Sequence, residues 1–246
     1  NRPVYFAITV PDEYYIGLSP YMHNTGLTYE VTPKLNASGY PSVNTDKMYR
    51  NMTERFRWGG LDKVTAPGQI YLDETVRRMV VTHRSAMLDL ATALFNEGIA
   101  ARDSSSADYA ADRFKKAREV LDLMLTKLPV EAMPLSLSVG QDTGDLYCRI
   151  GAATNDKKAS EKGLEILRNE VLRYADNVKY YQSLSPRLYS TLTRTDHAID
   201  TYFFMDMIQT YHNDGGDTAK LLEEIQSKGV NIERSQSLYE AATKKQ

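Results

Sequence analysis

From about residue 71 onward, apolar residues recur every three or four positions, which is the spacing of amphipathic helices. This pattern predicts antiparallel helices at about Asp73–Glu97, Ala107–Leu128, Pro134–Ala153, Lys157–Ser183 and Arg187–His212. Shorter helices are expected after Asp217 and at about Ser235–Lys244. Gly98 and Pro129 are expected to end the first two helices. The apolar seam of the fourth helix fits either ordinary core packing or a coiled coil.

The first 70 residues follow a different pattern, because they hold twelve of the 23 glycine and proline residues of the chain. Runs of β-branched and aromatic residues predict strands near Val4–Val10 and Leu27–Thr32, which could pair. Between them, Ser19–His23 predicts a short helix that begins with a capping serine and a proline. The abrupt start of the first strand leads us to expect a soluble piece of a longer protein.

A further helix is expected from Thr45 to Phe56, with Asn44 or Thr45 as its N-cap and Gly59-Gly60 after its end. The change of composition near residue 72 is the candidate domain boundary. We therefore predict a mixed α/β segment over residues 1–72 and a helical domain over residues 73–246.

Three residues of the Ala107–Leu128 helix match the second-helix signature of a tetratricopeptide repeat, Ala-x3-Phe-x2-Ala: Ala110, Phe114 and Ala117. The next helix pair lacks the aromatic residue and follows at a longer spacing than the repeat's usual period of about 34 residues. The predicted fold class is mainly α (α+β), a small N-terminal β element followed by a degenerate, tetratricopeptide-like array of helix hairpins. Phe114 should then be buried against the preceding helix, near Leu90 or Leu94.

Composition narrows the function classes. An apolar content of 42%, a charged content of 25% and a net charge of −2 are ordinary for a globular protein and argue against nucleic acid as a main partner. The single cysteine, Cys148, excludes an internal disulfide and a zinc cluster, and it is expected to be buried and inert. His83 is expected to be a core histidine.

No pattern in the sequence indicates an active site. His197 and Asp200 lie one helical turn apart beside Asp196, but a metal site needs more converging ligands. We therefore predict no catalytic residue, no cofactor and no metal. Two triplets fit the glycosylation sequon at Asn36 and Asn51, a match that arises often by chance. Eight of the 17 tyrosines lie in residues 1–75, where they could stack on sugars or pack a small sheet.

Several segments, in order, resemble the region that follows the last membrane helix in a bacterial family of large multi-pass proteins similar to protein O-mannosyltransferases. They are Arg2-Pro3-Val4-Tyr5-Phe6-Ala7, Tyr15-Ile16-Gly17-Leu18, Gly26-Leu27-Thr28-Tyr29-Glu30-Val31-Thr32-Pro33, Met48-Tyr49-x-Asn51-Met52, Phe56-x-Trp58-Gly59-Gly60 and Tyr71-Leu72-Asp73. The resemblance covers essentially the whole chain, and residues 1–75 are its specific part.

Members of that family resemble glycosyltransferases that use lipid-linked sugars. The resemblance implies that this chain is a non-catalytic, extracytoplasmic (periplasmic) accessory domain at the inner membrane. Its implied partners are the membrane half of the parent protein and an acceptor protein or peptide, and its implied role is either to position the acceptor or to stabilise the membrane half. The family's presumed catalytic acidic residues match no position here. The alternative is a stand-alone helical-repeat adaptor that binds peptides or proteins.

Overall fold

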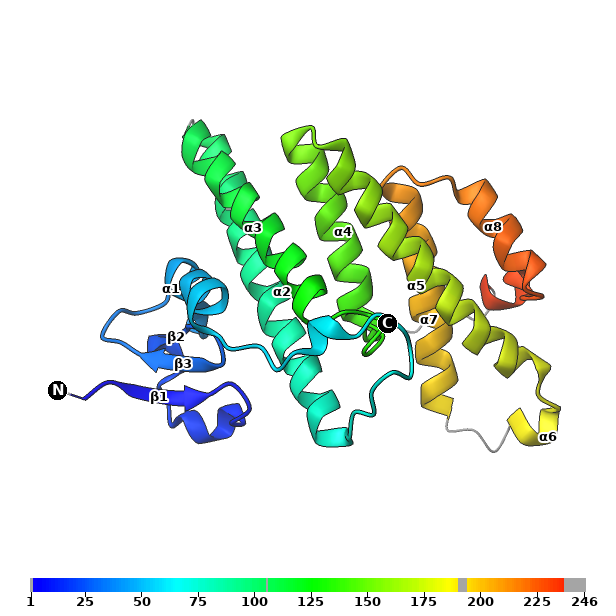
Figure 1. Cartoon of the computed structure of the whole chain (residues 1–246), viewed down its shortest axis with the longest axis horizontal. Helices are drawn as coiled ribbons and strands as arrows, with labels where there is room; N and C mark the ends of the chain where they lie inside the picture. The colour runs from blue at the N-terminus through cyan, green and yellow to red at the C-terminus, as the bar shows by residue number, and fades with distance from the viewer. Residues whose placement is uncertain (1, 105, 190–193, 237–246) are drawn as a thin grey trace. The chain divides into compact units, whose positions relative to one another are not determined.

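The computed structural model describes residues 2–104, 106–189 and 194–236 of the chain. Helices make up 67% of it, and a four-stranded sheet lies at the N-terminal end. This confirms the predicted fold class, a small β element followed by a helical array (Figure 1). No helix among the described residues is both long and apolar enough to cross a bilayer.

The sheet consists of β1 (Val4–Ala7), β2 (Met22–Asn24), β3 (Thr28–Val31) and β4 (Ser42–Val43), in the order β1-β3-β2-β4. The two predicted strands do pair, as β1 and β3, and their pairing is antiparallel. The other two were not predicted. The helix expected over Ser19–His23 is a single 3-10 turn, Ser19–Tyr21, because the backbone turns extended at Met22 (φ −98°, ψ 133°) and continues as β2.

The helix expected over Thr45–Phe56 is α1 (Thr45–Arg50) followed by a π-helical turn, Asn51–Arg55. Asn44 is its cap, since the Asn44 side chain accepts a hydrogen bond from the Lys47 amide. Single 3-10 turns lie at Asp12–Tyr15 and Leu61–Lys63.

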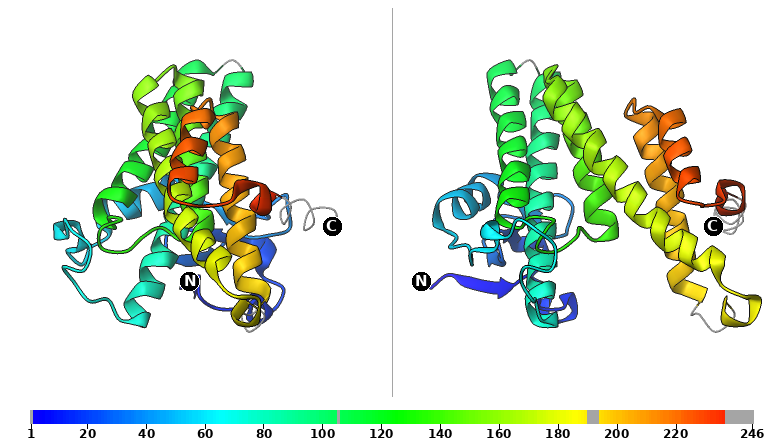
Figure 2. Two further views of the ribbon diagram at one scale, coloured as in Figure 1. Left: turned by 90° about the vertical axis from the view of Figure 1, so that its right-hand side faces the viewer. Right: turned by 45° about the vertical axis from the view of Figure 1, so that its right-hand side comes forward.

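Helices α2 (Glu74–Asp103) and α3 (Ala107–Lys127) form an antiparallel hairpin (Figures 1 and 2). The prediction that Gly98 ends the first helix is wrong, because α2 continues through it. Gly98 instead makes room for an aromatic ring: a Cβ there would lie 2.6 Å from Cε1 of Phe114. Phe114 is 4% exposed and its ring centroid lies 5.5 Å from that of Phe95. The predicted burial of Phe114 is confirmed, and its observed partners are Phe95 and Gly98.

The open end of this hairpin is held by Arg84, a residue that sequence analysis did not single out. Arg84 lies on α2 and is 1% exposed. Its guanidinium donates hydrogen bonds to four backbone carbonyls just after α3: those of Leu128, Pro129, Met133 and Pro134. These carbonyls lie in the turn that follows α3, and the buried guanidinium supplies donors to all four. The carbonyl of Pro129 also accepts hydrogen bonds from the amides of Ala132 and Met133.

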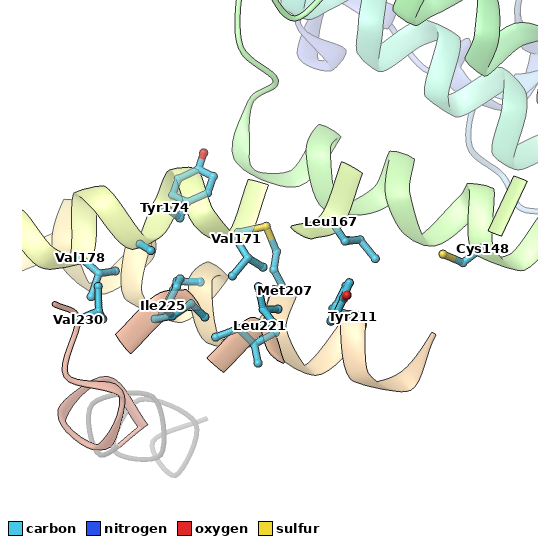
Figure 3. Close-up of a cluster of buried hydrophobic side chains, with 13 residues drawn as sticks. Cys148, Leu167, Val171, Tyr174, Val178, Met207, Tyr211, Leu221, Ile225 and Val230 are labelled. Atoms are coloured by element: carbon cyan, nitrogen blue, oxygen red, sulfur yellow. The ribbon is translucent and has the colours of Figure 1, made fainter. Parts of the chain in front are cut away.

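The remaining helices are α4 (Leu137–Thr154), α5 (Lys157–Ser183), α6 (Pro186–Tyr189), α7 (Arg194–Asn213) and α8 (Thr218–Ser227). α5 has the predicted bounds, and its apolar seam lies in a buried core with residues of α7 and α8 (Figure 3). α4 and α5 can pack closely because Gly163 has no side chain. A Cβ at this position would lie only 2.5 Å from the sulfur of Cys148. The helix expected over Arg187–His212 is observed as α6 and α7, and most of the one expected over Ser235–Lys244 lies outside the described residues.

The chain divides into two compact units, Asn1–Pro134 and Leu135–Gln246. Composition suggested a boundary near residue 72, and the secondary structure does change there. The two compact units divide after Pro134 instead. Residues of the N-terminal segment bond to the first hairpin: Asp46 to Arg113, Tyr49 to Glu119 and Asp62 to Lys127. These links place the sheet and the first hairpin in one unit.

We predict that Phe114→Ala lowers the free energy of unfolding by about 3–5 kcal/mol, because it empties a closely packed site between two helices. Urea unfolding followed by circular dichroism measures this change. Lys115→Ala, at an exposed position of the same helix, is the matched control and should change stability little. An unchanged midpoint for Phe114→Ala would contradict the packing described above.

Candidate functional site

The first unit contains an open pocket of about 660 Å³ beside the edge strand β4. Its walls come from one side chain of β2, the loop that follows β3, the stretch from β4 into α1, and one side chain of α2. The lining residues are His23, Thr32, Lys34, Leu35, Asn36, Ala37, Ser42, Val43, Asn44, Thr45 and Glu97. Most of these side chains can form hydrogen bonds, which makes this a polar pocket of ligand-binding size.

A network of buried polar side chains forms one wall. His23 and Ser42 face each other across the parallel β2–β4 pair, and Nδ1 of the imidazole lies 2.8 Å from the hydroxyl oxygen of Ser42. Ser42 donates to Oδ1 of Asn36 over 2.8 Å, and Nδ2 of Asn36 donates to the carbonyls of Met22 and Tyr40. His23 and Asn36 are each 8% exposed. The network therefore fixes the loop after β3 onto the sheet.

A second group of charges lies where the pocket meets the helices. Oε1 of Glu97 accepts a hydrogen bond from the hydroxyl of Thr45 over 2.9 Å, and Oε2 lies 3.5 Å from Nε of Arg113. Arg113 is 5% exposed and also donates to Asp46 over 2.6 Å. That hydrogen bond is the main reason why the pKa of Asp46 lies below its ordinary value. Asp46 and Glu97 therefore share one cation, and Oε2 of Glu97 is buried and accepts no hydrogen bond from the described residues.

Three lining residues have donor groups that form no hydrogen bond with any described residue: the ammonium of Lys34, the side-chain NH2 of Asn44 and the hydroxyl hydrogen of Thr32. Asn44 uses only its oxygen, to cap α1, and Thr32 uses its oxygen to accept from the amide of Lys34. The lining thus offers these three donors together with one acceptor, the buried Oε2 of Glu97, which accepts no hydrogen bond from the described residues. Donors of this kind suit carboxylate, phosphate or peptide carbonyl oxygens.

The sequence-predicted repeat residues Ala110, Phe114 and Ala117 are all buried in the α2–α3 hairpin and line no part of this pocket. His83 is half-buried at the surface, with its ring centroid 6.2 Å from that of Trp58, so the prediction of a core position is wrong. Its Nδ1 lies 2.6 Å from the carbonyl of Met79.

The region of the possible metal ligands contains no site among the residues that can be described. No group of three or more His, Cys, Asp or Glu side chains in the described part of the chain is placed to hold a metal ion. Asp200 accepts hydrogen bonds from Asn177 and Tyr181. The side chains of Asp196 and His197 lie outside the described set.

Two of the clustered tyrosines pack the sheet: the ring of Tyr15 lies edge-on to those of Phe6 and Tyr29. Tyr40 and Tyr71 are 73% and 86% exposed, so these two do not pack a core. Both sequon asparagines are engaged, because the side-chain amides of Asn36 and Asn51 donate to backbone carbonyls.

The pocket residues were not predicted from the sequence, because the patterns around them indicated other structures. His23 was placed in a predicted helix, and Asn36 was noticed only as part of a sequon. One signal could have been used: a histidine in a short stretch after Ser-Pro, followed by a loop rich in Asn, Ser and Thr, can form a side-chain network. No protein-family model, curated protein or solved structure matches the chain.

The single thiol of the chain, that of Cys148, is unreactive. Burial and the neighbouring carboxylate of Asp214 raise the pKa of Cys148 to about 12, so it carries a proton at neutral pH. The pKa of Asp214 is in turn raised to about 6, chiefly by burial and then by the charge of Asp145. Oδ2 of Asp214 is buried and accepts no hydrogen bond from the described residues.

This shift predicts a pH effect on stability. The folded chain holds the Asp214 proton more tightly than the unfolded chain does, so the contribution of this group to stability is fully present below about pH 4 and is lost as the pH rises through about 6. We expect Asp214→Asn to raise the free energy of unfolding by about 1–2 kcal/mol at neutral pH and to change it little near pH 4. Urea midpoints at both pH values test this. Equal effects of the substitution at the two pH values would contradict it.

Proposed function

We propose that this chain is a non-catalytic, extracytoplasmic accessory domain of a membrane glycosyltransferase-like protein, and that it positions an acceptor protein. The resemblance of residues 1–75 supports the parent family. The observation that supports a binding role is the polar pocket beside β4, whose walls are held by their own hydrogen bonds.

The placement of the pocket supports the same proposal. The segments that carry the resemblance supply β1 and β3 of the sheet, and Thr32 at the end of one of them lines the pocket. A site whose walls are fixed before the ligand arrives loses less entropy on binding. The donor groups of Lys34, Asn44 and Thr32 can donate hydrogen bonds to oxygen atoms of a ligand. A polypeptide offers carbonyl and hydroxyl oxygens along its length.

The helical hairpin supports the pocket mechanically. Glu97 reaches the pocket from the interior of α2, and Arg113 of α3 holds both Glu97 and Asp46. Sites that rest on packed helices keep a more constant geometry than sites on free loops. A role in stabilising the membrane half of the parent protein is compatible with this arrangement.

The proposal predicts binding without turnover. The purified chain, mixed with a polyprenyl-phosphate-linked sugar and a peptide rich in Ser and Thr, should bind the peptide and transfer no sugar. Binding is measured by fluorescence anisotropy and transfer by mass spectrometry of the peptide. Robust transfer by the isolated chain would contradict the accessory role.

The location of binding distinguishes the alternative, a stand-alone helical-repeat adaptor. Hydrogen exchange of the chain with and without the peptide should show protection at residues 32–45. Protection confined to the helices of residues 135–236 would favour the adaptor and overturn the pocket assignment.

A further inference from the structure

We infer that the pocket beside β4 takes an uncharged, extended peptide segment, which joins the sheet as a further strand along the free edge of β4. The inference rests on the proposed function, since it states how the acceptor polypeptide is held. Three observations carry it: the unpaired backbone groups of Val43, the position of the pocket along the strand, and the balance of charge in the lining.

The outer edge of β4 has an unpaired backbone donor and an unpaired backbone acceptor. β4 runs parallel to β2, and the amide of Asn44 donates to the carbonyl of Asn24 over 2.9 Å. The N–H and C=O groups of successive residues in a strand point to opposite sides, so Ser42 also faces β2 and Val43 faces away from it. Neither the N–H nor the C=O of Val43 therefore has a partner among the described residues.

The pocket lies along this edge of the strand rather than over one face of the sheet. Successive side chains of a strand point to opposite faces, and Ser42 and Val43 both line the pocket. The loop after β3 contributes Thr32 and Lys34 to the lining, and α2 contributes Glu97. An added strand lies about 4.8 Å from its neighbour in a sheet, so its backbone would occupy this space.

The charges in the lining favour a peptide segment without charged side chains. Lys34 contributes one positive charge, and Glu97 contributes one negative charge that shares the Arg113 cation with Asp46. Oε2 of Glu97 is buried and accepts no hydrogen bond from the described residues, so a further carboxylate beside it is unfavourable. A cationic side chain would enter the pocket that Lys34 lines, where like charges repel each other.

The polar side chains of the lining favour Ser and Thr residues in the peptide. The side-chain NH2 of Asn44 and the hydroxyl hydrogen of Thr32 form no hydrogen bond with any described residue. Both groups can donate to the hydroxyl or carbonyl oxygens of a bound segment. When a peptide adds to a sheet edge, its main chain supplies affinity and its alternate side chains supply specificity.

The residues on either side of Val43 restrict the edge to a short partner. Pro41, the preceding residue on the outward side, has no N–H to donate, and α1 begins at Thr45. The β4 edge of a second copy of the chain carries the same restrictions, so two copies would exchange only the bonds of their Val43 residues. A separate peptide segment can also reach the side-chain donors of the lining.

Residue-resolved hydrogen exchange of the full chain, measured by nuclear magnetic resonance, tests the inference. The probe is the peptide Ser-Thr-Val-Thr-Ser, blocked at both ends so that it carries no charge. In the free chain, we expect the Val43 amide to exchange at least about tenfold faster than the amides of Ser42 and Asn44, which face β2. With the peptide at saturation, exchange at Val43 should slow about tenfold, and exchange at the other two should change less.

Fluorescence anisotropy with the labelled peptide supplies a second measurement. N-methylation of every peptide nitrogen keeps the side chains but removes the backbone donors, and it should weaken binding at least about tenfold. Val43→Pro removes the outward N–H and should weaken the unmodified peptide about tenfold. Ala7→Pro is the matched control and should not, because the amide of Ile8 bonds to β3's neighbour Leu27 and Ala7 therefore faces outward at the opposite edge of the sheet.

Strand addition is overturned if the methylated peptide binds as tightly as the unmodified one, or if saturating peptide leaves the Val43 amide unchanged. If the peptide still protects residues 32–45 in either case, the proposed accessory function stands. Protection of Val43 that rises with the concentration of the chain alone would assign the edge to a second copy and also overturn the inference. If Val43→Pro does not fold, the methylated peptide and the exchange measurement still decide.

Discussion

The first unit depends on one buried cation, Arg113. Its guanidinium lies between three elements, since it donates to Asp46 of α1, lies 3.5 Å from Glu97 of α2 and stacks 4.4 Å from the Tyr109 ring of its own helix. A buried charge that loses its partners is strongly destabilising, so these contacts constrain one another. This arrangement explains why the polar, tyrosine-rich segment and the first helical hairpin form one compact unit.

The same cation links the fold to the pocket. Without Arg113, the carboxylates of Asp46 and Glu97 would lose the cation that lies close to both, and Glu97 lines the pocket. With it, Asp46 and Glu97 share one cation, and Lys34 adds a positive charge to the lining. The small sheet supplies the network of His23, Ser42 and Asn36 that fixes the loop after β3, and the helices supply Glu97. The packing of the first unit and the lining of the pocket therefore depend on the same few side chains.

The helices could be predicted from sequence because their signal is long and repeated. The helix of residues Lys157–Ser183 carries its apolar period over about five turns and begins at an N-cap, Asp156, so its bounds follow from pattern and chemistry together. Gly98 misled the prediction, because glycine ends helices but also permits close contact, and only the position of Phe114 distinguishes the two. Strands β2 and β4 are too short to show alternation.

The pocket could not be predicted for a related reason. His23, Asn36 and Ser42 are far enough apart in sequence that only the β2–β4 pairing brings them together. Their residue types also fit turns and caps, which is how isolated polar residues in a glycine- and proline-rich segment are usually explained. Arg84 escaped for a further reason, since the carbonyls that it binds belong to the turn after another helix.

Native-state hydrogen exchange of the full chain at increasing denaturant most directly tests the claim that the sheet and first hairpin form one cooperative unit. We predict that the amides of β2 and β3 open with the same free energy as those of α2 around Leu90–Phe95, and that Asp46→Asn lowers both opening free energies together. A sheet that opens at a distinctly lower free energy, while α2 remains protected, would contradict it.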